Sequence, residues 1–290
     1  MTRALVVGDV MLDVVTRPTG PVQPTSDTPA ATHVGRGGSS ANVAVALAAT
    51  GVEVVHVGAA GRDPAADLAS ADLAAHGVVV RWEILNGSTG VVVAVVAADG
   101  QRAMLTDRGV NARLSWGHVA AVLADGIDHV HVSGYTLLDE GSRAVGSRAL
   151  EWARERGITT SVDACSAAPL RAVSPGVFVA ALGRVTYLFA NEEEAAVLGE
   201  SDDLHRVARA LAGTVAELVV TQGSRGAVVY TPEGCWRANA DEVDVVDTTG
   251  AGDAAVGAYL GARVGGRAID VALESAMGAS ARVVGRLGAR

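Results

Sequence analysis

The chain has 290 residues, of which 49% are hydrophobic and only 3% aromatic, so its core has to be built mainly from Ala, Val and Leu. The formal net charge of −9 argues against nucleic acid or an anionic membrane surface as a general partner. All 23 basic residues are arginine, which argues against a Walker-type phosphate loop, a protein-kinase fold and Schiff-base chemistry, because each of these needs a lysine.

Short β-branched runs alternate with helical stretches through most of the chain. Strands are predicted at residues 4–8, 53–58, 129–134, 159–164, 185–190 and 217–223, with a hairpin over 226–238. Helices are predicted at residues 42–50, 67–77, 147–157 and 191–199. Strands that alternate with helices of this length predict a parallel sheet with helices on both faces.

Two regions depart from this alternation. Residues 14–35 are rich in proline, and residues 90–107 contain two apolar stretches around Asp99-Gly100, which is a hairpin signal. Together they would form a small β-sheet outside the main layer. They could be two surface excursions or a lid over a cleft, and the residues alone favour neither.

A glycine-rich stretch begins at Gly35 and leads into the first predicted helix. Gly35 and Gly37 have the spacing of a dinucleotide-binding fingerprint, but Ser40 stands where its third glycine belongs. We favour a Gly37-Gly38 pair that lets a ligand approach the backbone, with Asn42 facing that ligand. Capping of the helix by Ser40 or Asn42 is the alternative.

Two later stretches could contact a nucleotide or a metal ion. Asn191 suits a helix N-cap and is followed by acids as far as Glu194, an arrangement that a helix start explains equally well. A predicted strand ends in a turn that offers Thr221, Gly223 and Gly226. That turn suits a phosphate contact and an ordinary strand connection alike.

The clearest chemical signal is the sequence DTTGAGD, which starts at Asp247. Gly250 and Gly252 predict a tight turn into a helix, whose bare N–H groups could stabilise charge on a transferred phosphoryl group. Asp253 follows, and the helix dipole favours an ionised carboxylate there at neutral pH. Such a carboxylate can accept the proton of an attacking hydroxyl. Helix capping by Asp253 is the alternative, but capping would not require the preceding GAG.

With these residues the chain resembles the PfkB (ribokinase-like) family of carbohydrate kinases over essentially its whole length. The two family signatures occur in order, GG followed by a helix-opening Asn at 37–42 and D-T-x-G-A-G-D at 247–253, with N-x-x-E at 191–194 between them. The resemblance implies one α/β domain over 1–290, a three-layer α/β/α ribokinase-like fold with a mostly parallel central sheet. It also implies a small β-sheet lid formed by about 14–35 and 90–107.

The resemblance further implies that the γ-phosphate of ATP passes to a sugar hydroxyl with Mg²⁺ as cofactor, and the family also allows a bound K⁺. Roles carry over by position. The catalytic base would be Asp253, the metal ligand would be Glu194, and the anion hole would be formed by Gly250, Ala251 and Gly252. The residues that contact the sugar would be Asp13, Gly37, Gly38 and Asn42. The residues that contact the nucleotide would be Asn191, Thr221, Gly223, Gly226 and Thr248.

Three arginines and two differences from the family sequence pattern bear on which sugar is the acceptor. Arg36 and Arg108 flank the predicted cleft and Arg102 lies in the lid hairpin, so Arg108 is a candidate for binding the carboxylate or phosphate of an acidic or phosphorylated sugar. Solvated surface charges are the alternative. Ser39 and Met11 stand where ribokinases usually carry Lys and Asn, which argues against ribose itself.

Two other functions stay open. A nucleoside kinase of this fold usually places an aromatic side chain over the base, but the two lid segments contain no Phe, Tyr or Trp. A catalytically silent sugar-sensing protein would not need Asp253 and GAG, although Ala254-Ala255 after the base departs from the family. The expected partners are a sugar and ATP, with no nucleic acid and no membrane, and a second copy that pairs through the lid as a homodimer.

Nothing in the sequence predicts export or membrane insertion. Asp9 and Asp13 interrupt the N-terminal apolar run, and no other apolar run is long enough to span a bilayer. Cys165 and Cys235 lie far apart without CxxC spacing, which indicates a reducing compartment and no metal cluster. We therefore expect a cytoplasmic protein.

Overall fold

The computed structural model of the chain describes residues 2–97, 102–123, 126–245 and 247–285, and this part of the chain forms two β-sheets. The larger sheet has nine strands in the order β13-β12-β11-β10-β9-β8-β1-β4-β5. The pairings from β5 across to β11 are parallel, and β12 and β13 extend the sheet as antiparallel strands. Its strands are β1 (Arg3–Val7), β4 (Glu53–Ala60), β5 (Val79–Ile84), β8 (His129–Ser133), β9 (Thr159–Asp163), β10 (Val185–Asn191), β11 (Val215–Thr221), β12 (Ala227–Thr231) and β13 (Gly234–Ala238).

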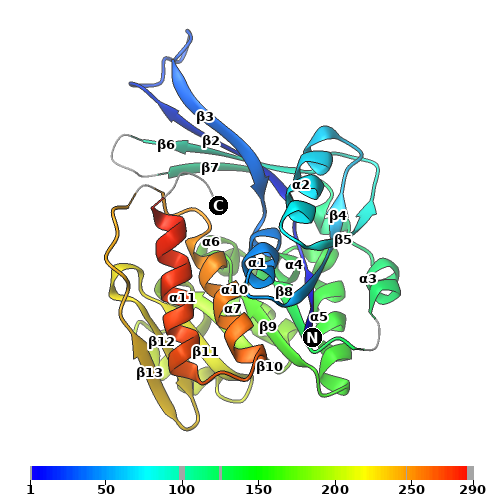
Figure 1. Ribbon diagram of the computed structural model, residues 1–290, viewed down its shortest axis with the longest axis vertical. Coiled ribbons are helices and arrows are strands. Elements are labelled where there is room, and N and C mark those ends of the chain that lie inside the picture. Colours follow the sequence, from blue (N-terminus) through cyan, green and yellow to red (C-terminus); the bar gives the residue numbers. More distant parts are fainter. Residues whose placement is uncertain (1, 98–101, 124–125, 246, 286–290) are drawn as a thin grey trace.

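Helices cover both faces of the larger sheet (Figure 1) because its strands are apolar on both sides. In β1, Leu5 and Val7 point into one hydrophobic cluster, whereas Ala4 and Val6 point into the other. The first cluster packs against α3 (Trp116–Val122), α4 (Gly134–Leu138), α5 (Glu140–Glu155), α6 (Ala167–Val173), α7 (Pro175–Leu182), α8 (Glu192–Gly199) and α9 (Leu204–Leu211), and the second against α1 (Ser39–Ala48), α2 (Pro64–Ala75), α10 (Ala251–Val264) and α11 (Ile269–Val284).

The predicted fold class is confirmed. Each strand predicted for the main sheet is present, with ends within two residues of the predicted ones, and the hairpin over 226–238 is β12 and β13. The sequence analysis missed β5, which forms one edge of the sheet. It also placed the start of one helix too late, because α5 begins at Glu140 rather than at Ser147.

The smaller sheet corresponds to the two segments predicted to form a lid. Its strands run in the order β3-β2-β6-β7; β2 and β6 are parallel, and the two outer pairs are antiparallel. The predicted hairpin turn at Asp99-Gly100 lies outside the described residues. The strands are β2 (Met11–Pro18), β3 (Ala30–Gly37), β6 (Gly90–Val96) and β7 (Arg102–Asp107), and we call them the small sheet.

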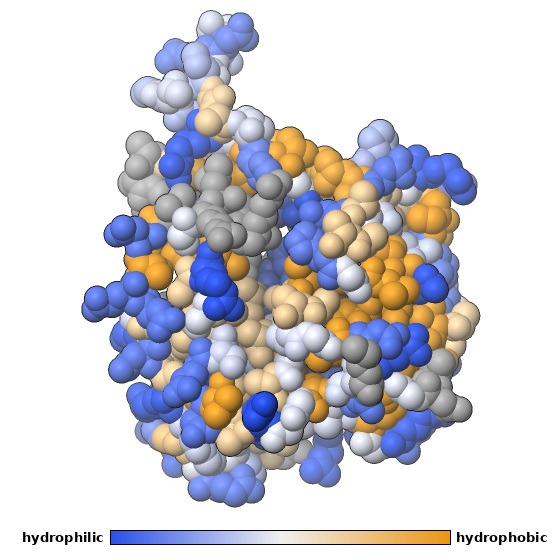
Figure 2. All heavy atoms as spheres, in the orientation of Figure 1, coloured by the Kyte–Doolittle hydropathy of each residue, from blue (hydrophilic) through white to orange (hydrophobic). Residues whose placement is uncertain are grey.

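The small sheet is joined to the rest of the chain at one end only. At that end Met11 is paired with Gly37 and Gly90, and Val91 with Asp107, where β2 and β6 begin and β3 and β7 finish. Figure 1 shows the sheet projecting past the helices of the main body. Figure 2 shows that its farthest part carries mainly hydrophilic side chains. Among the described helices, none is both long and apolar enough to cross a membrane.

Candidate active site

A cavity of about 550 Å³ opens where the parallel strands of the larger sheet end, the usual place for a ligand in an open α/β sheet. One face of the small sheet forms its opposite wall, because Asp13, Val92 and Thr106 stand in register on β2, β6 and β7 and line it. The predicted site residues that line the cavity are Asp13, Gly38, Asn42, Arg108, Asn191, Glu194, Thr221, Gly223, Thr248, Gly250, Gly252 and Asp253.

The glycine-rich turn leads into a helix, as predicted. Gly250 adopts a left-handed conformation (φ 77°) directly before α10, which begins at Ala251. Asp247 is buried and accepts hydrogen bonds from the backbone N–H (2.9 Å) and hydroxyl (2.7 Å) of Thr249, which fixes the entry to the turn. The backbone N–H of Ala251 donates to the Thr248 carbonyl oxygen at 3.3 Å, and a side chain at Gly252 would meet no other atom within 4 Å, so there is room for a ligand beside the start of α10.

Asp253 lies in the first turn of α10 and is held by α1. Its Oδ1 accepts a hydrogen bond from Ser39 Oγ and its Oδ2 one from Asn42 Nδ2, both at 2.8 Å. Burial, with the nearby carboxylates of Asp163 and Asp9, raises the pKa of Asp253 to about 7, although the two hydrogen bonds oppose that rise. The expectation of a fully ionised carboxylate at neutral pH is therefore corrected, because burial outweighs the helix dipole.

Asp13 stands across the cavity on β2. It packs so closely on Gly37 that a Cβ at that glycine would lie 1.8 Å from Asp13 Oδ1. Burial raises the pKa of Asp13 to about 6; the carboxylates of Asp9 and Asp247 add to the rise and Arg36 opposes it. Gly37 thus supports a residue of the cavity wall from behind.

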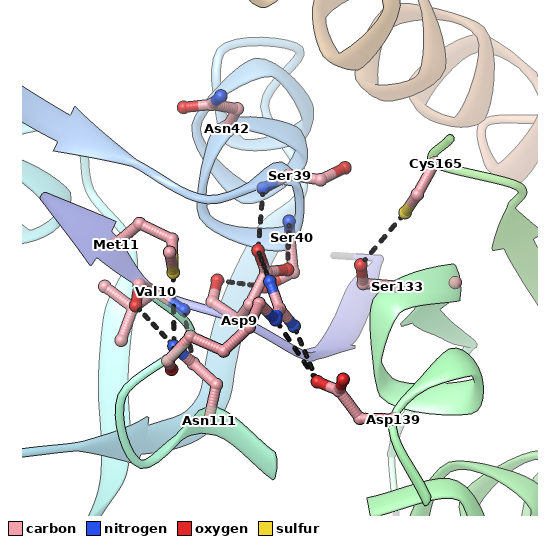
Figure 3. Close-up of polar contacts among 12 residues, drawn as sticks. Asp9, Val10, Met11, Ser39, Ser40, Asn42, Asn111, Ser133, Asp139 and Cys165 are labelled. Atoms are coloured by element: carbon pink, nitrogen blue, oxygen red, sulfur yellow. Dashed lines mark hydrogen bonds and ion pairs between the residues drawn. The ribbon is translucent and has the colours of Figure 1, made fainter. Parts of the chain in front are cut away.

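Arg108 follows β7 and lines the cavity, whereas Arg36 lies behind the cavity wall. Arg108 donates from Nε (3.2 Å) and Nη2 (3.0 Å) to Asp139 and from Nη1 (3.3 Å) to Asp9, and it stacks on the ring of Tyr135 at 4.5 Å. Figure 3 shows Asp9 at the centre of this cluster, below the start of α1 that carries Ser39. Arg36 is buried behind the wall: it donates at 2.6 Å to Asp72 of α2 and from Nη1 to Oδ1 of Asn42, which lines the cavity, so it flanks the cleft without lining it.

The two stretches predicted to contact a nucleotide or a metal ion lie at the ends of two adjacent strands, β10 and β11. Asn191 and Glu194 form a capping box at the start of α8, in which Glu194 accepts from the backbone N–H and the Nδ2 of Asn191, both at 2.8 Å. Burial raises the pKa of Glu194 to about 7. Thr221 and Gly223 line the cavity, but Gly226 does not, since it packs against the backbone of Ala238.

Comparison of the sequence with known protein families identifies the family of this chain. The model of the pfkB family of carbohydrate kinases matches residues 1–290. The chain belongs to that family. The predicted family and the predicted class of enzyme, a carbohydrate kinase, are thereby confirmed. An ATP-dependent ribose-1-phosphate kinase from Halopiger xanaduensis is 33% identical over 256 residues, which are 88% of this pfkB-family chain and 82% of that protein.

Other matches bear on the length and the fold of this pfkB-family kinase. The bifunctional protein HldE of Shewanella amazonensis is 29% identical, and the match spans 99% of this chain but 60% of HldE. A putative ribokinase II from E. coli, in complex with ATP and Mg²⁺, has a TM-score of 0.88 at 22% identity and covers all of this chain and 94% of its own. Adenosine kinase from Sinorhizobium meliloti has a TM-score of 0.87 at 24% identity, covering 100% and 95%. These two structures share the ribokinase-like fold.

Two carboxylates that line the cavity of this pfkB-family kinase were given no role by the sequence analysis. Asp9 follows β1 and is contacted by the backbone N–H groups of Ser39 and Ser40 at 3.3 and 3.4 Å. Asp163 ends β9, and its Oδ2 lies 2.8 Å from Ser39 Oγ, within hydrogen-bonding distance. The available signal was that both come at or just after the carboxyl end of a predicted strand, where ligand sites in parallel sheets collect.

Proposed function

We propose that this carbohydrate kinase transfers the γ-phosphate of ATP to a hydroxyl of a phosphorylated pentose. The observation that carries the proposal is Arg108, the only cationic side chain among the described residues that line the cavity. Three of its five N–H donors are used by Asp139 and Asp9, which leaves one hydrogen on each of Nη1 and Nη2. Two adjacent donors suit a phosphate group. The relative from Halopiger xanaduensis, named for such an acceptor, supports the same class.

In this proposal Asp253 accepts the proton of the acceptor hydroxyl, and the backbone N–H groups of Gly250, Ala251 and Gly252 stabilise charge on the transferred group. The acceptor binds to Asp13 and Asn42, with Gly38 allowing close approach to the backbone. Thr248, Thr221, Gly223 and Asn191 are assigned to the nucleotide phosphates. A side chain at Gly223 would meet no other atom within 4 Å, which leaves its backbone open to such a contact.

A magnesium ion fits the chemistry of this cavity. Glu194 offers carboxylate oxygens, the ligands that Mg²⁺ prefers, and each of them has accepted only one hydrogen bond. Burial, to which the charges of Asp163 and Glu193 add, raises the pKa of Glu194 to about 7, and a cation bound beside it would favour its ionised form. Bound there, the ion would neutralise charge on the ATP phosphates. A bound K⁺, which the resemblance to the family allows, stays a prediction.

Changing Glu194 to glutamine is expected to raise the Mg²⁺ concentration required for half-maximal activity and to lower kcat at limiting Mg²⁺. Glutamine keeps the capping box, so the fold should be preserved. Glu193→Gln is a matched control, because Glu193 is exposed and pairs with Arg171 at 2.9 Å. Magnesium titrations of both variants test the assignment, and identical titrations would show that Glu194 only starts a helix.

An acceptor screen tests the proposed function directly. Release of ADP is followed with ATP and Mg²⁺ in the presence of ribose 1-phosphate, ribose 5-phosphate, ribose or adenosine. A phosphorylated pentose is expected to give the highest kcat/KM. Adenosine as the best acceptor would favour a nucleoside kinase, which the structural similarity to adenosine kinase leaves open. No turnover with any carbohydrate or nucleoside would favour a catalytically silent sugar-sensing protein.

We also propose that two copies pair through the outer face of the small sheet. Val34, Val14, Val93 and Leu105 stand in register across its four strands, on the face opposite the one that lines the cavity. Val34 is 44% exposed and Leu105 is 65% exposed. An apolar stripe of this kind on a sheet face is typical of a contact with another chain.

Leu105→Glu is expected to convert a dimer into a monomer, because two carboxylates would be placed in an apolar contact. Light scattering coupled to size exclusion measures the molar mass, which should fall from twice 29.2 kDa to 29.2 kDa. The control is Leu68→Glu, because Leu68 lies on the exposed side of α2. Met104→Glu is not suitable, because Met104 lines the cavity. A parent chain that is monomeric at micromolar concentration would refute the proposed dimer.

A further inference from the structure

Tyr135 lines the cavity in contact with Arg108. The centre of its ring lies 4.5 Å from the guanidinium carbon, so the cation is stacked on the face of the ring. Asp139 accepts from Nε and Nη2 of the same guanidinium at 3.2 and 3.0 Å. The ring and this carboxylate together hold Arg108 in one orientation. Tyr135 therefore supports the residue that is proposed to bind the acceptor phosphate.

The local fold places Tyr135 at the cavity wall. β8 ends at Ser133, and α4 begins at Gly134 with no loop between them. A Cβ at Gly134 would lie 2.1 Å from the backbone oxygen of Asp163, so α4 starts in direct contact with the end of β9. This close approach requires glycine. It brings the next residue, Tyr135, to the same wall that Asp163 lines.

The hydroxyl of Tyr135 has no hydrogen-bond partner among the described residues. Tyr135 is a half-buried residue, and its hydroxyl is not one of the fully buried atoms that lack a partner, so solvent reaches it. A phenol hydroxyl has one hydrogen to donate. In Tyr135 that hydrogen is used by no residue of the described chain and is available to a ligand in the cavity.

The surroundings keep this hydroxyl protonated. Burial raises the pKa of the Tyr135 hydroxyl well above its usual value. The neighbouring Cys165, Asp9 and Asp163 add to the rise, which is opposed by the guanidinium that is stacked on the ring. The phenol is thus neutral at physiological pH. A neutral donor can approach an anionic ligand without charge repulsion, which an ionised carboxylate of the same wall cannot do.

The donors that Arg108 keeps free do not satisfy a whole phosphate group. A phosphate monoester presents three strong acceptor oxygens. Asp139 and Asp9 use three of the five N–H hydrogens of Arg108, which leaves two. A phosphate bound there therefore has room for a third donor. The Tyr135 hydroxyl belongs to the side chain that is stacked on Arg108 and has its hydrogen free.

We propose that Tyr135 binds the acceptor phosphate together with Arg108 and is a specificity-determining residue for a phosphorylated pentose; the inference rests on the proposed function. The hydroxyl donates to one phosphate oxygen, and Arg108 donates its two free hydrogens to the same group. The ring contributes separately, because it fixes the plane of the guanidinium. Tyr135 takes no part in proton transfer, so its replacement should act on KM for the acceptor rather than on kcat.

Steady-state kinetics of Tyr135→Phe with ribose 1-phosphate and with ribose test the hydroxyl. Phenylalanine keeps the ring on Arg108 and removes only the hydroxyl. KM for ribose 1-phosphate should rise about tenfold, the loss expected for one hydrogen bond to a charged group, whereas KM for ribose and kcat with either sugar should not change. Tyr135→Leu also removes the ring and should raise KM for ribose 1-phosphate about threefold more.

A double variant tests whether the two residues bind one group. In Arg108→Ala combined with Tyr135→Phe, the rise of KM for ribose 1-phosphate should be smaller than the product of the two single rises, because both donors contact the same phosphate. Calorimetric titration of ribose 1-phosphate without ATP measures the binding step alone. The Kd of Tyr135→Phe should rise by the same factor as its KM.

Tyr230→Phe is the matched control. The hydroxyl of Tyr230 also lacks a hydrogen-bond partner in the described part of the chain, but its ring packs on His205 and does not line the cavity. Its removal should leave both KM values unchanged.

Two results would overturn the inference. One is a folded Tyr135→Phe enzyme with the KM and Kd of the parent for ribose 1-phosphate. The other is an equal rise of KM for both sugars, which would place the hydroxyl on the pentose itself. A parent that neither binds nor phosphorylates ribose 1-phosphate better than ribose refutes the proposed function, and the parent alone reveals that outcome.

Discussion

Changing Asp253 to asparagine is expected to lower kcat by about 10² to 10⁴, the usual loss when a general base is removed. Asparagine keeps the size of the side chain and can still contact Ser39 and Asn42, which hold the two carboxyl oxygens at 2.8 Å in the parent. It cannot accept a proton at neutral pH. KM for the acceptor should change little, because the proposed acceptor contacts lie on other residues, Asp13 and Arg108 among them.

The same substitution has a predictable effect on stability. Burial raises the pKa of Asp253 from 3.8 to about 7, so the native state binds a proton that the unfolded chain has lost between these pH values. This stabilising contribution is fully present below about pH 4 and is lost as the pH rises through about 7. Asp253→Asn, which has no charge to bury, should therefore melt at a higher temperature than the parent at pH 8. The kcat of the parent should rise with pH through about 7.

Thermal melts and kcat measured on one preparation separate the two roles of Asp253. A helix cap predicts a variant that turns over within a few-fold of the parent, because asparagine caps nearly as well as aspartate. A base predicts a folded protein that is almost inactive. Folded and active Asp253→Asn enzyme would falsify the assignment of Asp253 as the base.

Changing Arg108 to alanine is expected to raise KM for a phosphorylated pentose about 10- to 100-fold, which corresponds to the roughly 1.5–3 kcal/mol of hydrogen bonds to a charged group. KM for an unphosphorylated sugar should not rise. The reason is that the two hydrogens free on Arg108 are proposed to bind the acceptor phosphate, which an unphosphorylated sugar lacks. Steady-state kinetics with ribose 1-phosphate and ribose measure the difference.

Two controls accompany Arg108→Ala. Arg113→Ala removes an arginine near in sequence whose Nη1 donates at 2.6 Å to the backbone oxygen of Asn86, and it should leave both KM values unchanged. A melt is needed because Asp9, which is 3% exposed, loses a cationic partner in Arg108→Ala. An equal rise of KM for both sugars would mean that Arg108 only organises the wall of the cavity.

Local patterns in the sequence predicted the main sheet, the small sheet and the glycine-rich turn at Gly250, because strand periodicity and turn chemistry are properties of short segments. The contact between Ser39 and Asp163 was not predictable in this way, since 124 residues separate them and only the packing of α1 beside the end of β9 joins them. The same reason applies to the hydrogen bond of Arg36 with Asp72, which was not predicted. Asp72 lies on a helix whose position relative to β3 no local pattern reveals.

The charge state of Asp253 shows a second limit. A helix N-terminus favours a carboxylate, and that local argument was correct as far as it went. Burial and the carboxylates of Asp163 and Asp9 come from other elements and shift the balance the other way. The pKa of a side chain in a site formed by several elements depends on charges from distant parts of the sequence. A local motif can therefore identify Asp253 as a candidate base but cannot predict its protonation state.

Because the small sheet is attached at one end only, a small rotation at that end would move its other end by a larger distance. Its longest strands have eight residues, so the free end lies roughly 26 Å from the anchored one at about 3.3 Å per residue. A tilt of about 10° at the anchor would therefore carry the free end by about 4–5 Å, whereas Asp13, two residues from the start of β2, would move by only about 1 Å. A tilt of this kind would thus displace the far end of the sheet much more than the residues next to the anchor that line the cavity.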